Sequence, residues 1–387
     1  MSSAISDGSL WRAFASAVAE MEKVVYEDPR ISSDEVRAEG LRYLTRIMAG
    51  GIPMTMEAWD ADFPQLVKML PPTIQFGLPA ADCIYHWAAV RGGATYRIHG
   101  ERGSSRLFDV ETREGHTAHL AQWKLVDRGA DFEIAPDGSF EVILSNTEQP
   151  GNWLRLPDGP GSIMIRQYFY DWATEEPATL YIEKEGAHYP PAPVSPGSVE
   201  EGMRLLIDWV RGVPAACRHA VEGHYTAPDD ALEFVPLDFG WADLLYGKGH
   251  YSCAPDEAVI IEVTPPVAPY WGIQLVTHYW EALDWHRRQA SINGFQAHLD
   301  EDGVFRAVIA HTDPGVPNWL DTAGRPNGLV AARYFRAEST PVPSLRTVPL
   351  AKLRDELPAT TPTVTPEQRQ ESLRARALSV RRRGCDS

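Results

Sequence analysis

Two stretches of the chain follow one pattern, DGSFEVILSNTEQPGNWL at residues 137–154 and DGVFRAVIAHTDPGVPNWL at residues 302–320. Each begins with Asp-Gly, continues with an apolar run of strand length and a polar turn containing Pro and Gly, and ends in Asn-Trp-Leu. The first parts align at an offset of 302 − 137 = 165 residues. The Asn-Trp-Leu triplets, and a later Tyr-Phe pair at 168–169 and 334–335, align at an offset of 318 − 152 = 166 residues. Matches in register at this period indicate a duplicated module.

Each copy has the pattern of a strand, a turn and a second strand, and further strand-length segments flank both copies. The chain is therefore expected to be mostly β, with two related β-sandwich or jelly-roll lobes. The repeated Asn is expected to bond turn backbone through its amide. The Trp is expected to close the end of each sandwich rather than to stack on a ligand.

The rest of the chain divides around these lobes. Residues 1–80 are predicted to be a helical N-terminal region, including a short third helix within residues 58–70, and residues 81–187 the first lobe. Residues 188–225 are predicted to form a Pro-rich linker and a helical insertion, and residues 226–350 the second lobe. Residues 351–387 are predicted to form a C-terminal helix and basic tail, because Thr-Pro-Glu-Gln at 365–368 is a helix-start signal. This tail is expected to dock on, or lie beside, the acidic body.

Composition excludes several classes of function. The 387 residues carry a formal charge of −17, so nucleic acid is an unfavourable partner. No run of apolar residues is long enough for a membrane span, and the N-terminal residues lack a signal-peptide pattern. The four cysteines are scattered without a CxxC pair, which argues against disulfides or zinc. The expectation is a soluble, cytoplasmic protein.

Several segments resemble a known family. GNWLRLPDGPGSIMIRQYFYDW at 151–172, ADCIYHWAAV at 81–90, ATYRIHGERG at 94–103 and PYWGIQLVTHYWEALDW at 269–285 are similar to motifs of domain-of-unknown-function family 1214, often found with family 1254-like regions. The chain departs from the family pattern at Asp82-Cys83, where Asp-Asn is usual. The resemblance implies β-sandwich lobes and assigns no chemistry.

No cofactor or metal is expected from the motifs. The chain has no GxxxxGK[ST] phosphate loop, no GxGxxG dinucleotide fingerprint, no GxSxG nucleophile elbow and no HExxH zinc motif. These absences argue against nucleotide-dependent transfer, NAD or FAD chemistry, an α/β-hydrolase and a zinc protease of the HExxH type.

The run YWGIQLVTHYWEALDWH at 270–286 is the densest candidate site. If it begins as a strand, Tyr270, Gln274 and His278 share one face, which suits a pocket wall or a half-buried strand facing water. Two acid–base candidates, His278 and Glu281, follow from this run. The candidate substrate-binding residues are Tyr270, Trp271, Gln274, Trp280, Tyr85 and Arg166.

Differences between the two copies supply the other candidates. The second copy has His311 and Asp313 where the first has Asn146 and Glu148, so His311 is a candidate base and Asp313 the carboxylate that orients it.

Arg166 aligns with Ala332, with Arg333 shifted by one position. Arg166 can hold a ligand carboxylate or pair with an interior acid, and the second role is favoured.

These observations leave two hypotheses open. The leading one is a cofactor-independent lyase, isomerase or hydrolase acting on a small, largely apolar molecule in a cleft between the lobes. It requires Gln274, His278 and His311 to share one cavity. The alternative is a non-catalytic β-sandwich module that binds a hydrophobic ligand, a sugar or a partner protein. A homo-oligomer is compatible with either hypothesis.

Overall fold

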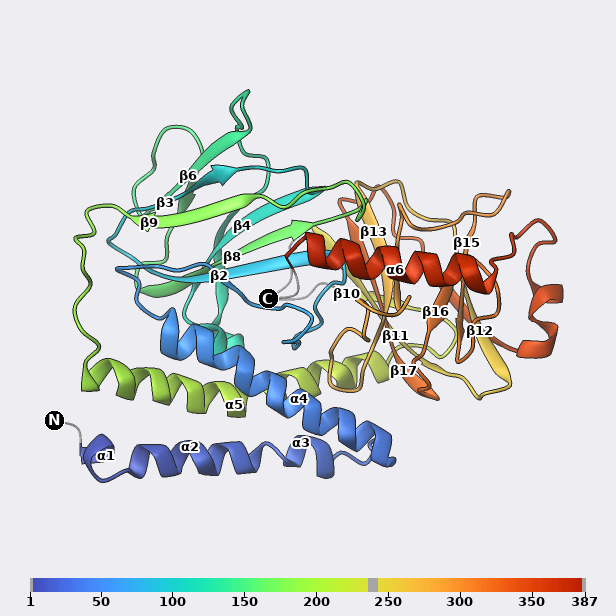
Figure 1. Ribbon diagram of the computed structural model, residues 1–387, viewed down its shortest axis with the longest axis horizontal. Coiled ribbons are helices and arrows are strands. Elements are labelled where there is room, and N and C mark those ends of the chain that lie inside the picture. Colours follow the sequence, from blue (N-terminus) through green and yellow to red (C-terminus); the bar gives the residue numbers. More distant parts are fainter. Residues whose placement is uncertain (1–2, 236–242, 385–387) are drawn as a thin grey trace.

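The two halves of the chain fold into β-sandwiches whose strands pair in the same order (Figure 1), in a computed structural model that describes residues 3–235 and 243–384. In the first lobe a five-stranded sheet of order β1-β2-β8-β4-β5 packs on a four-stranded sheet of order β7-β6-β3-β9. In the second lobe the corresponding orders are β10-β11-β17-β13-β14 and β16-β15-β12-β18. The predicted duplication of a sandwich is therefore confirmed.

The strands of each lobe follow the chain with short connections. In the first lobe they are β1 (Val67–Lys68), β2 (Cys83–Arg91), β3 (Tyr96–Glu101), β4 (Leu107–Glu114), β5 (Lys124–Gly129), β6 (Ser139–Ser145), β7 (Trp153–Arg155), β8 (Pro160–Tyr168) and β9 (Thr179–Lys184). In the second they are β10 (Glu233–Val235), β11 (Leu244–Ser252), β12 (Glu257–Val263), β13 (Tyr270–Val276), β14 (Ser291–Asn293), β15 (Phe305–Ala310), β16 (Trp319–Asp321), β17 (Asn327–Phe335) and β18 (Ser344–Pro349).

The central strands of the five-stranded sheets are buried on both faces, and alternate side chains enter different cores. On β8, Ile163 and Ile165 point into the first sandwich, whereas Met164 and Tyr168 join a core shared by both lobes and the helices. On β17, Val330 and Ala332 point into the second sandwich, whereas Ala331 joins the shared core. This two-residue alternation makes one face of each five-stranded sheet part of a common interior.

The strand register corrects the sequence alignment at Arg166. Arg166 pairs with Tyr85 across β2 and β8, and Arg333 pairs with Tyr246 across β11 and β17. The equivalent of Arg166 is therefore Arg333, at an offset of 333 − 166 = 167, and not Ala332. The connection from β16 to β17 is residues 322–326, one residue longer than the 156–159 connection in the first lobe. A one-residue shift moves a side chain to the opposite face of a strand.

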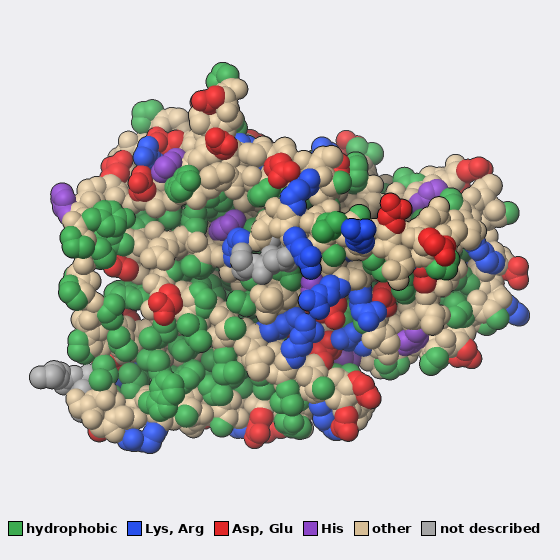
Figure 2. Space-filling model, viewed as in Figure 1, with side chains coloured by type: hydrophobic (Ala, Val, Ile, Leu, Met, Phe, Trp, Pro, Cys, Tyr) green, Lys and Arg blue, Asp and Glu red, His purple; other side chains and the backbone are tan. Residues whose placement is uncertain are grey.

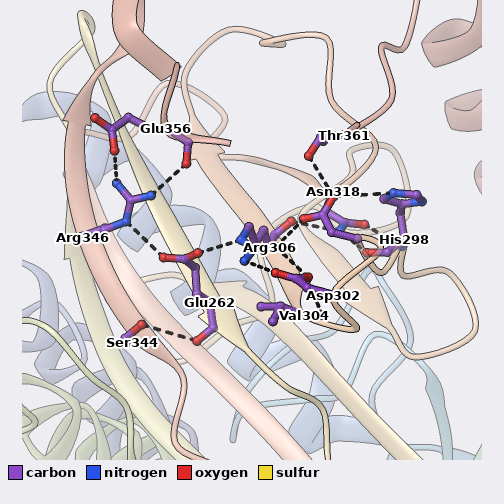
Figure 3. Close-up of polar contacts among 11 residues, drawn as sticks. Glu262, His298, Asp302, Val304, Arg306, Asn318, Ser344, Arg346, Glu356 and Thr361 are labelled. Carbon is purple, nitrogen blue, oxygen red and sulfur yellow. Dashed lines mark hydrogen bonds and ion pairs between the residues drawn. The ribbon is translucent and has the colours of Figure 1, made fainter. Parts of the chain in front are cut away.

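The repeated Asn performs the same structural task in each lobe. The Asn318 amide donates to His298 O at 2.7 Å and to Arg306 O at 2.9 Å, and its oxygen accepts from His298 N at 2.9 Å (Figure 3). In the same way, the Asn152 amide donates to the backbone oxygens of Glu133 and Glu141, and its oxygen accepts from Glu133 N. The side chain thus ties a neighbouring loop to the strand beside it, as the pattern predicted.

Each following Trp closes this arrangement with its indole N–H. Trp153 donates to Ser145 Oγ and Trp319 to Ala310 O, both at 3.0 Å. Figure 3 also shows ion pairs around the second copy, where Arg306 reaches Glu262 and Asp302. The Asn-Trp-Leu motif is therefore a structural element of the sandwich.

The helices form a layer beneath the shared core and a brace beside the second lobe (Figure 1). The helices are α1 (Ser3–Ser6), α2 (Ser9–Glu20), α3 (Lys23–Tyr26), α4 (Asp34–Ile52), α5 (Pro196–Tyr225) and α6 (Pro366–Arg382), with short helical turns η1 (Pro53–Glu57), η2 (Thr117–Gln122) and η3 (Leu350–Glu356). Ser33 caps α4, and Ser195 caps α5 in a capping box. None of the helices that the structure describes is both long and apolar enough to cross a membrane.

The sequence prediction was wrong for residues 58–70, where the expected third helix is absent. Pro64 interrupts that segment, and β1 at its end pairs with β2. The C-terminal helix is confirmed, with the Thr365 capping box at its start. It docks on the body: Arg369 donates to Val316 O and Arg376 packs over Trp172. Figure 2 shows Lys and Arg side chains gathered around the C-terminal half of α6.

The lobes are joined through the buried carboxylate of Asp82, which precedes β2. Its oxygens accept hydrogen bonds from Tyr270 Oη and Asn293 Nδ2 of the second lobe and from Trp172 Nε1 of the first, each at 2.7 Å. Gln274 adds a second link, since its amide donates to Pro79 O and accepts from Ala81 N. Charge-assisted bonds of this kind in a buried site hold the two five-stranded sheets in one orientation.

The duplication provides a matched pair for testing the Asn motif. Asn318→Ala is expected to lower the free energy of unfolding by about 2–3 kcal/mol, because it leaves buried backbone groups without partners. Asn152→Ala is expected to cost less, about 1 kcal/mol, because its surroundings are more exposed to water. Urea denaturation of both variants and the wild type measures the difference. Equal costs, or a larger cost at Asn152, would contradict this account.

Candidate functional site

A cavity lies between the two lobes, where the five-stranded sheets meet the helical layer. It is narrow, with a volume of about 70 Å³, well below the several hundred Å³ of pockets that enclose a drug-sized ligand. Its lining is mostly aliphatic and aromatic, with two arginines: Met69, Leu70, Phe76, Gly77, Leu78, Tyr85, Leu120, Trp123, Met164, Arg166, Tyr168, Tyr246, Trp280 and Arg333. Both lobes and the segment before β2 therefore contribute to one site.

The duplicated strands supply two equivalent pairs of side chains to this cavity. Tyr85 and Arg166 come from β2 and β8, and Tyr246 and Arg333 from β11 and β17, at the same register positions. Both arginines are almost completely buried, at 4% and 3% exposed. The cavity thus lies between equivalent positions of the two five-stranded sheets.

Arg166 pairs with two acidic side chains of the neighbouring strand β4. Its guanidinium lies 3.1 Å from Asp109 and 2.5 Å from Glu111. Glu111 is also paired with Arg113, which packs over the Trp123 ring of the cavity wall. Arg166 therefore performs the role that sequence analysis favoured, pairing with interior acids, and it also lines the cavity.

Arg333 has a different environment. Its Nη2 donates to Leu78 O at 2.6 Å, and the guanidinium lies 5.7 Å from the centre of the Tyr246 ring. Within residues 3–235 and 243–384, no carboxylate lies within ion-pair distance of Arg333. A guanidinium remains charged at any physiological pH, so this buried positive charge has no negative partner in the described structure.

The backbone of the cavity wall is strained at two positions. Leu78 and Trp280 adopt positive φ angles of 57° and 61°, an uncommon conformation for residues with a side chain. They are bonded to each other, because Leu78 N donates to Trp280 O at 2.9 Å. Such strain persists only where the surroundings impose it, and it concentrates at functional sites.

The indole of Trp280 is fixed from behind by His224 of α5. The His224 Nδ1–H donates to Gly249 O, which leaves Nε2 to accept from Trp280 Nε1 at 3.1 Å. Burial lowers the pKa of His224 to about 4, so this histidine is neutral near pH 7. His224 therefore holds the Trp280 indole in the cavity wall and does not act as an acid toward a ligand. No motif or spacing in the sequence pointed to His224.

Three of the predicted site residues, Tyr85, Arg166 and Trp280, line the cavity. Tyr270 and Gln274 lie nearby and hold the lobes together through Asp82 and through Pro79 and Ala81. Trp271 belongs to the core of the second sandwich, where it packs on Phe305. Strand β13 is buried on both faces, so neither of its faces sees water as the alternative interpretation required.

The predicted acid–base residues lie in separate places. His278 bonds Tyr225 and Asn327, and Glu281 is buried in an ion pair with Arg46 at 2.7 Å. Burial raises the pKa of Glu281 to about 7, but its carboxylate does not line the cavity.

The expected pairing of His311 with Asp313 is not formed. His311 Nε2 donates to Cys253 O at 2.7 Å and its Nδ1 accepts from Thr322 Oγ1, whereas Asp313 pairs with Arg369 of α6. The leading enzyme hypothesis requires Gln274, His278 and His311 to share one cavity, and they do not. Strand β13 ends at Val276, so His278 lies beyond the strand and does not share a strand face with Gln274.

The buried acids beside Arg166 predict a pH-dependent stability. Burial and the neighbouring Glu111 raise the pKa of Asp109 to about 8, despite the opposing effect of Arg166. Between the unfolded pKa near ~4 and the folded value the folded state holds one extra proton, so stability falls as pH rises through this range. Asp109→Asn removes this titration. Its stability relative to wild type is expected to increase by up to about 1.4 kcal/mol per pH unit between pH ~5 and ~7.

Denaturation of both proteins in urea at several pH values measures this difference, in which titrations common to both cancel. A difference that stays constant across that range would show that Asp109 is already ionised in the folded protein.

The described residues contain no group of three or more His, Cys, Asp or Glu side chains arranged to hold a metal ion. Three cysteines, Cys83, Cys217 and Cys253, are free and buried, and Cys385 lies outside the described residues.

Comparison with known proteins finds a solved structure of the same architecture and two matches to one family model. A solved structure of an uncharacterized protein from Burkholderia cenocepacia is 29% identical, with a TM-score of 0.86 over 90% of this chain and 99% of that one. The VPA0106 protein from Vibrio parahaemolyticus shows only a weak likeness, at 9% identity and a TM-score of 0.47 over 86% of this chain and 100% of that one. None of the curated proteins compared with the chain matches it. The model of the family of proteins of unknown function DUF1214 matches residues 87–170 and 257–339, once in each sandwich, and these two matches support an assignment of the chain to that family.

Proposed function

We propose that the protein binds a small, largely apolar molecule in the cavity between its lobes, without converting it. The observation that carries this proposal is the cavity itself, an aromatic and aliphatic pocket formed jointly by both repeats. Pockets of this composition obtain affinity from apolar contact and orientation from a few polar groups. The strained pair Leu78 and Trp280 supports the same conclusion, because it shapes the wall at a cost in backbone energy.

The groups that line the cavity favour binding over acid–base catalysis. Among the residues that the structure describes, none of those lining the cavity is a histidine, a cysteine or a carboxylic acid. The tyrosines are poor acids there, because burial raises the pKa of Tyr85 and Tyr168 further above the usual value. A general acid or base functions best with a pKa near the working pH, and neither of these two tyrosines meets that condition.

One observation keeps the enzyme alternative open to test. Asp109, with a pKa of about 8, contacts Arg166 directly behind the cavity wall. A proton could pass between this acid and a bound molecule only if Arg166 moved aside. Incubation of any identified ligand with the protein, followed by mass spectrometry of the small molecule, distinguishes the two functions: turnover would favour an enzyme.

We also propose a cytoplasmic location. The three free cysteines that the structure describes are all buried, and no disulfide joins them. Free thiols persist most readily in a reducing compartment. Localisation of the tagged protein by fractionation of the host cell tests this proposal.

Filling the cavity is expected to weaken binding. Leu120 lines the cavity from η2 and is partly exposed, so Leu120→Trp adds bulk with little disturbance of the core. The neutral fluorescent probe N-phenyl-1-naphthylamine is expected to bind the wild type and to bind Leu120→Trp at least about tenfold more weakly, a loss of about 1.4 kcal/mol. Fluorescence titration measures both affinities.

Leu125→Trp is the matched control, because Leu125 is exposed on β5 and does not line the cavity. Its affinity for the probe is expected to stay within about twofold of wild type. A probe that fails to bind the wild type, or that binds Leu120→Trp equally well, would contradict the proposal.

A further inference from the structure

The duplicated frame allows each charge in the first lobe to be compared with its counterpart in the second. Across β4 and β8, Asp109 is paired with Arg166; across β13 and β17, Gly272 is paired with Arg333. Two residues further along the same strands, Glu111 of the first lobe corresponds to Gln274 of the second. The arginine is thus present in both repeats, whereas both of its acids are replaced by uncharged residues in the second.

The replacement changes what surrounds the second arginine. Gln274 directs its amide to Pro79 and Ala81 and forms no bond with Arg333. Gly272 has no side chain, and a Cβ at that position would lie 2.9 Å from the Tyr270 hydroxyl. Arg333 is left with one hydrogen bond, to Leu78 O, within the described part of the chain.

A buried cation without a counter-charge is costly. The effective penalty for burying an ion is several kcal/mol, and a guanidinium cannot lower it by losing its proton. Arg333 lines the cavity and is only 3% exposed, so water compensates little of its charge. The remaining N–H groups of Arg333 have no protein acceptor among the described residues and are available to a molecule in the cavity.

We infer that the molecule bound in the cavity carries one carboxylate, which pairs with Arg333 while its apolar part contacts Met164 and Trp280. The inference rests on the proposed function and specifies its ligand class, a monocarboxylic acid with an apolar body. A single unbalanced positive charge matches a single negative one, and the planar guanidinium matches a planar carboxylate.

Tyr85 supplies a second contact for this carboxylate. Its hydroxyl oxygen accepts from Ala80 N at 3.0 Å, so the hydroxyl hydrogen can be donated to an anion. Tyr85 lies in the same wall as Arg166, and its counterpart Tyr246 packs beside Arg333. The charge of Arg333 also acts on the Tyr85 hydroxyl, so these two polar groups lie near each other in an otherwise apolar cavity.

The ligand class is tested with two probes that have the same number of carbon atoms and differ in the head group, an anionic carboxylate or a neutral hydroxyl. Octanoate and 1-octanol are titrated into wild-type protein that has been stripped of small molecules by unfolding and refolding. Octanoate is expected to bind at least about tenfold more tightly than 1-octanol, as a charge-assisted pair predicts. Equal binding of the two would overturn the inference and leave the proposed function standing. Binding of neither, together with failure of the neutral fluorescent probe, would overturn both.

Two variants at equivalent positions separate recognition from folding. Arg333→Met is expected to raise the melting temperature of the stripped protein, to lose the preference for octanoate and to retain 1-octanol. Arg166→Met is expected to lower the melting temperature, because it leaves the acids Asp109 and Glu111 without this cation. If Arg333→Met lowers the melting temperature as much as Arg166→Met does, Arg333 is a structural residue and the inference is wrong. Retention of the octanoate preference in Arg333→Met would also overturn it.

Discussion

The arrangement of the two lobes depends on one buried carboxylate, that of Asp82. Tyr270 and Asn293 reach it from the second lobe and Trp172 from the first. A buried carboxylate without donors would be strongly destabilising, so the position of Asp82 and those of its three partners determine one another. The two five-stranded sheets are thereby held face to face with the helical layer, and the cavity is the space that their side chains leave between them.

Duplication explains why this space is both apolar and charged. Each repeat presents a Tyr and an Arg from the same register positions, so joining the repeats brings two arginines to one interior. In the first repeat the arginine contacts two acidic side chains, Asp109 and Glu111, whereas in the second it has no acidic partner among the residues that the structure describes. The repeats have kept their sandwich frame, including the Asn that ties loop to strand, while their charges have diverged at the place where they meet. Divergence at this position, rather than in the frame, is what a ligand-binding interior would require.

The helices complete the site in a way that the repeats alone could not. α5 carries His224, which fixes the Trp280 indole, and η2 contributes Leu120 to the wall. The segment before β2 contributes Leu78, whose carbonyl holds Arg333 and whose amide bonds Trp280. Leu78 and Trp280, both with positive φ, therefore meet at the cavity. Their bond to each other and the contacts of His224 and Arg333 hold them in this strained conformation.

The sequence by itself determined the repeat, the β-sandwich class, the role of the Asn-Trp-Leu motif and the capped start of α6. These features follow from local rules of strand alternation, turns and caps, which act over a few residues. It also identified Tyr85, Arg166 and Trp280 as binding candidates.

Only the tertiary structure decided that Arg166 corresponds to Arg333, that His311 and Asp313 bond other partners, and that His224 supports the site. The physical reason is that strand register is set by non-local pairing, and one extra residue in a turn reverses which face a side chain occupies. Sequence alignment placed Arg166 over Ala332, in a sandwich core, whereas the register places it over Arg333, in the cavity.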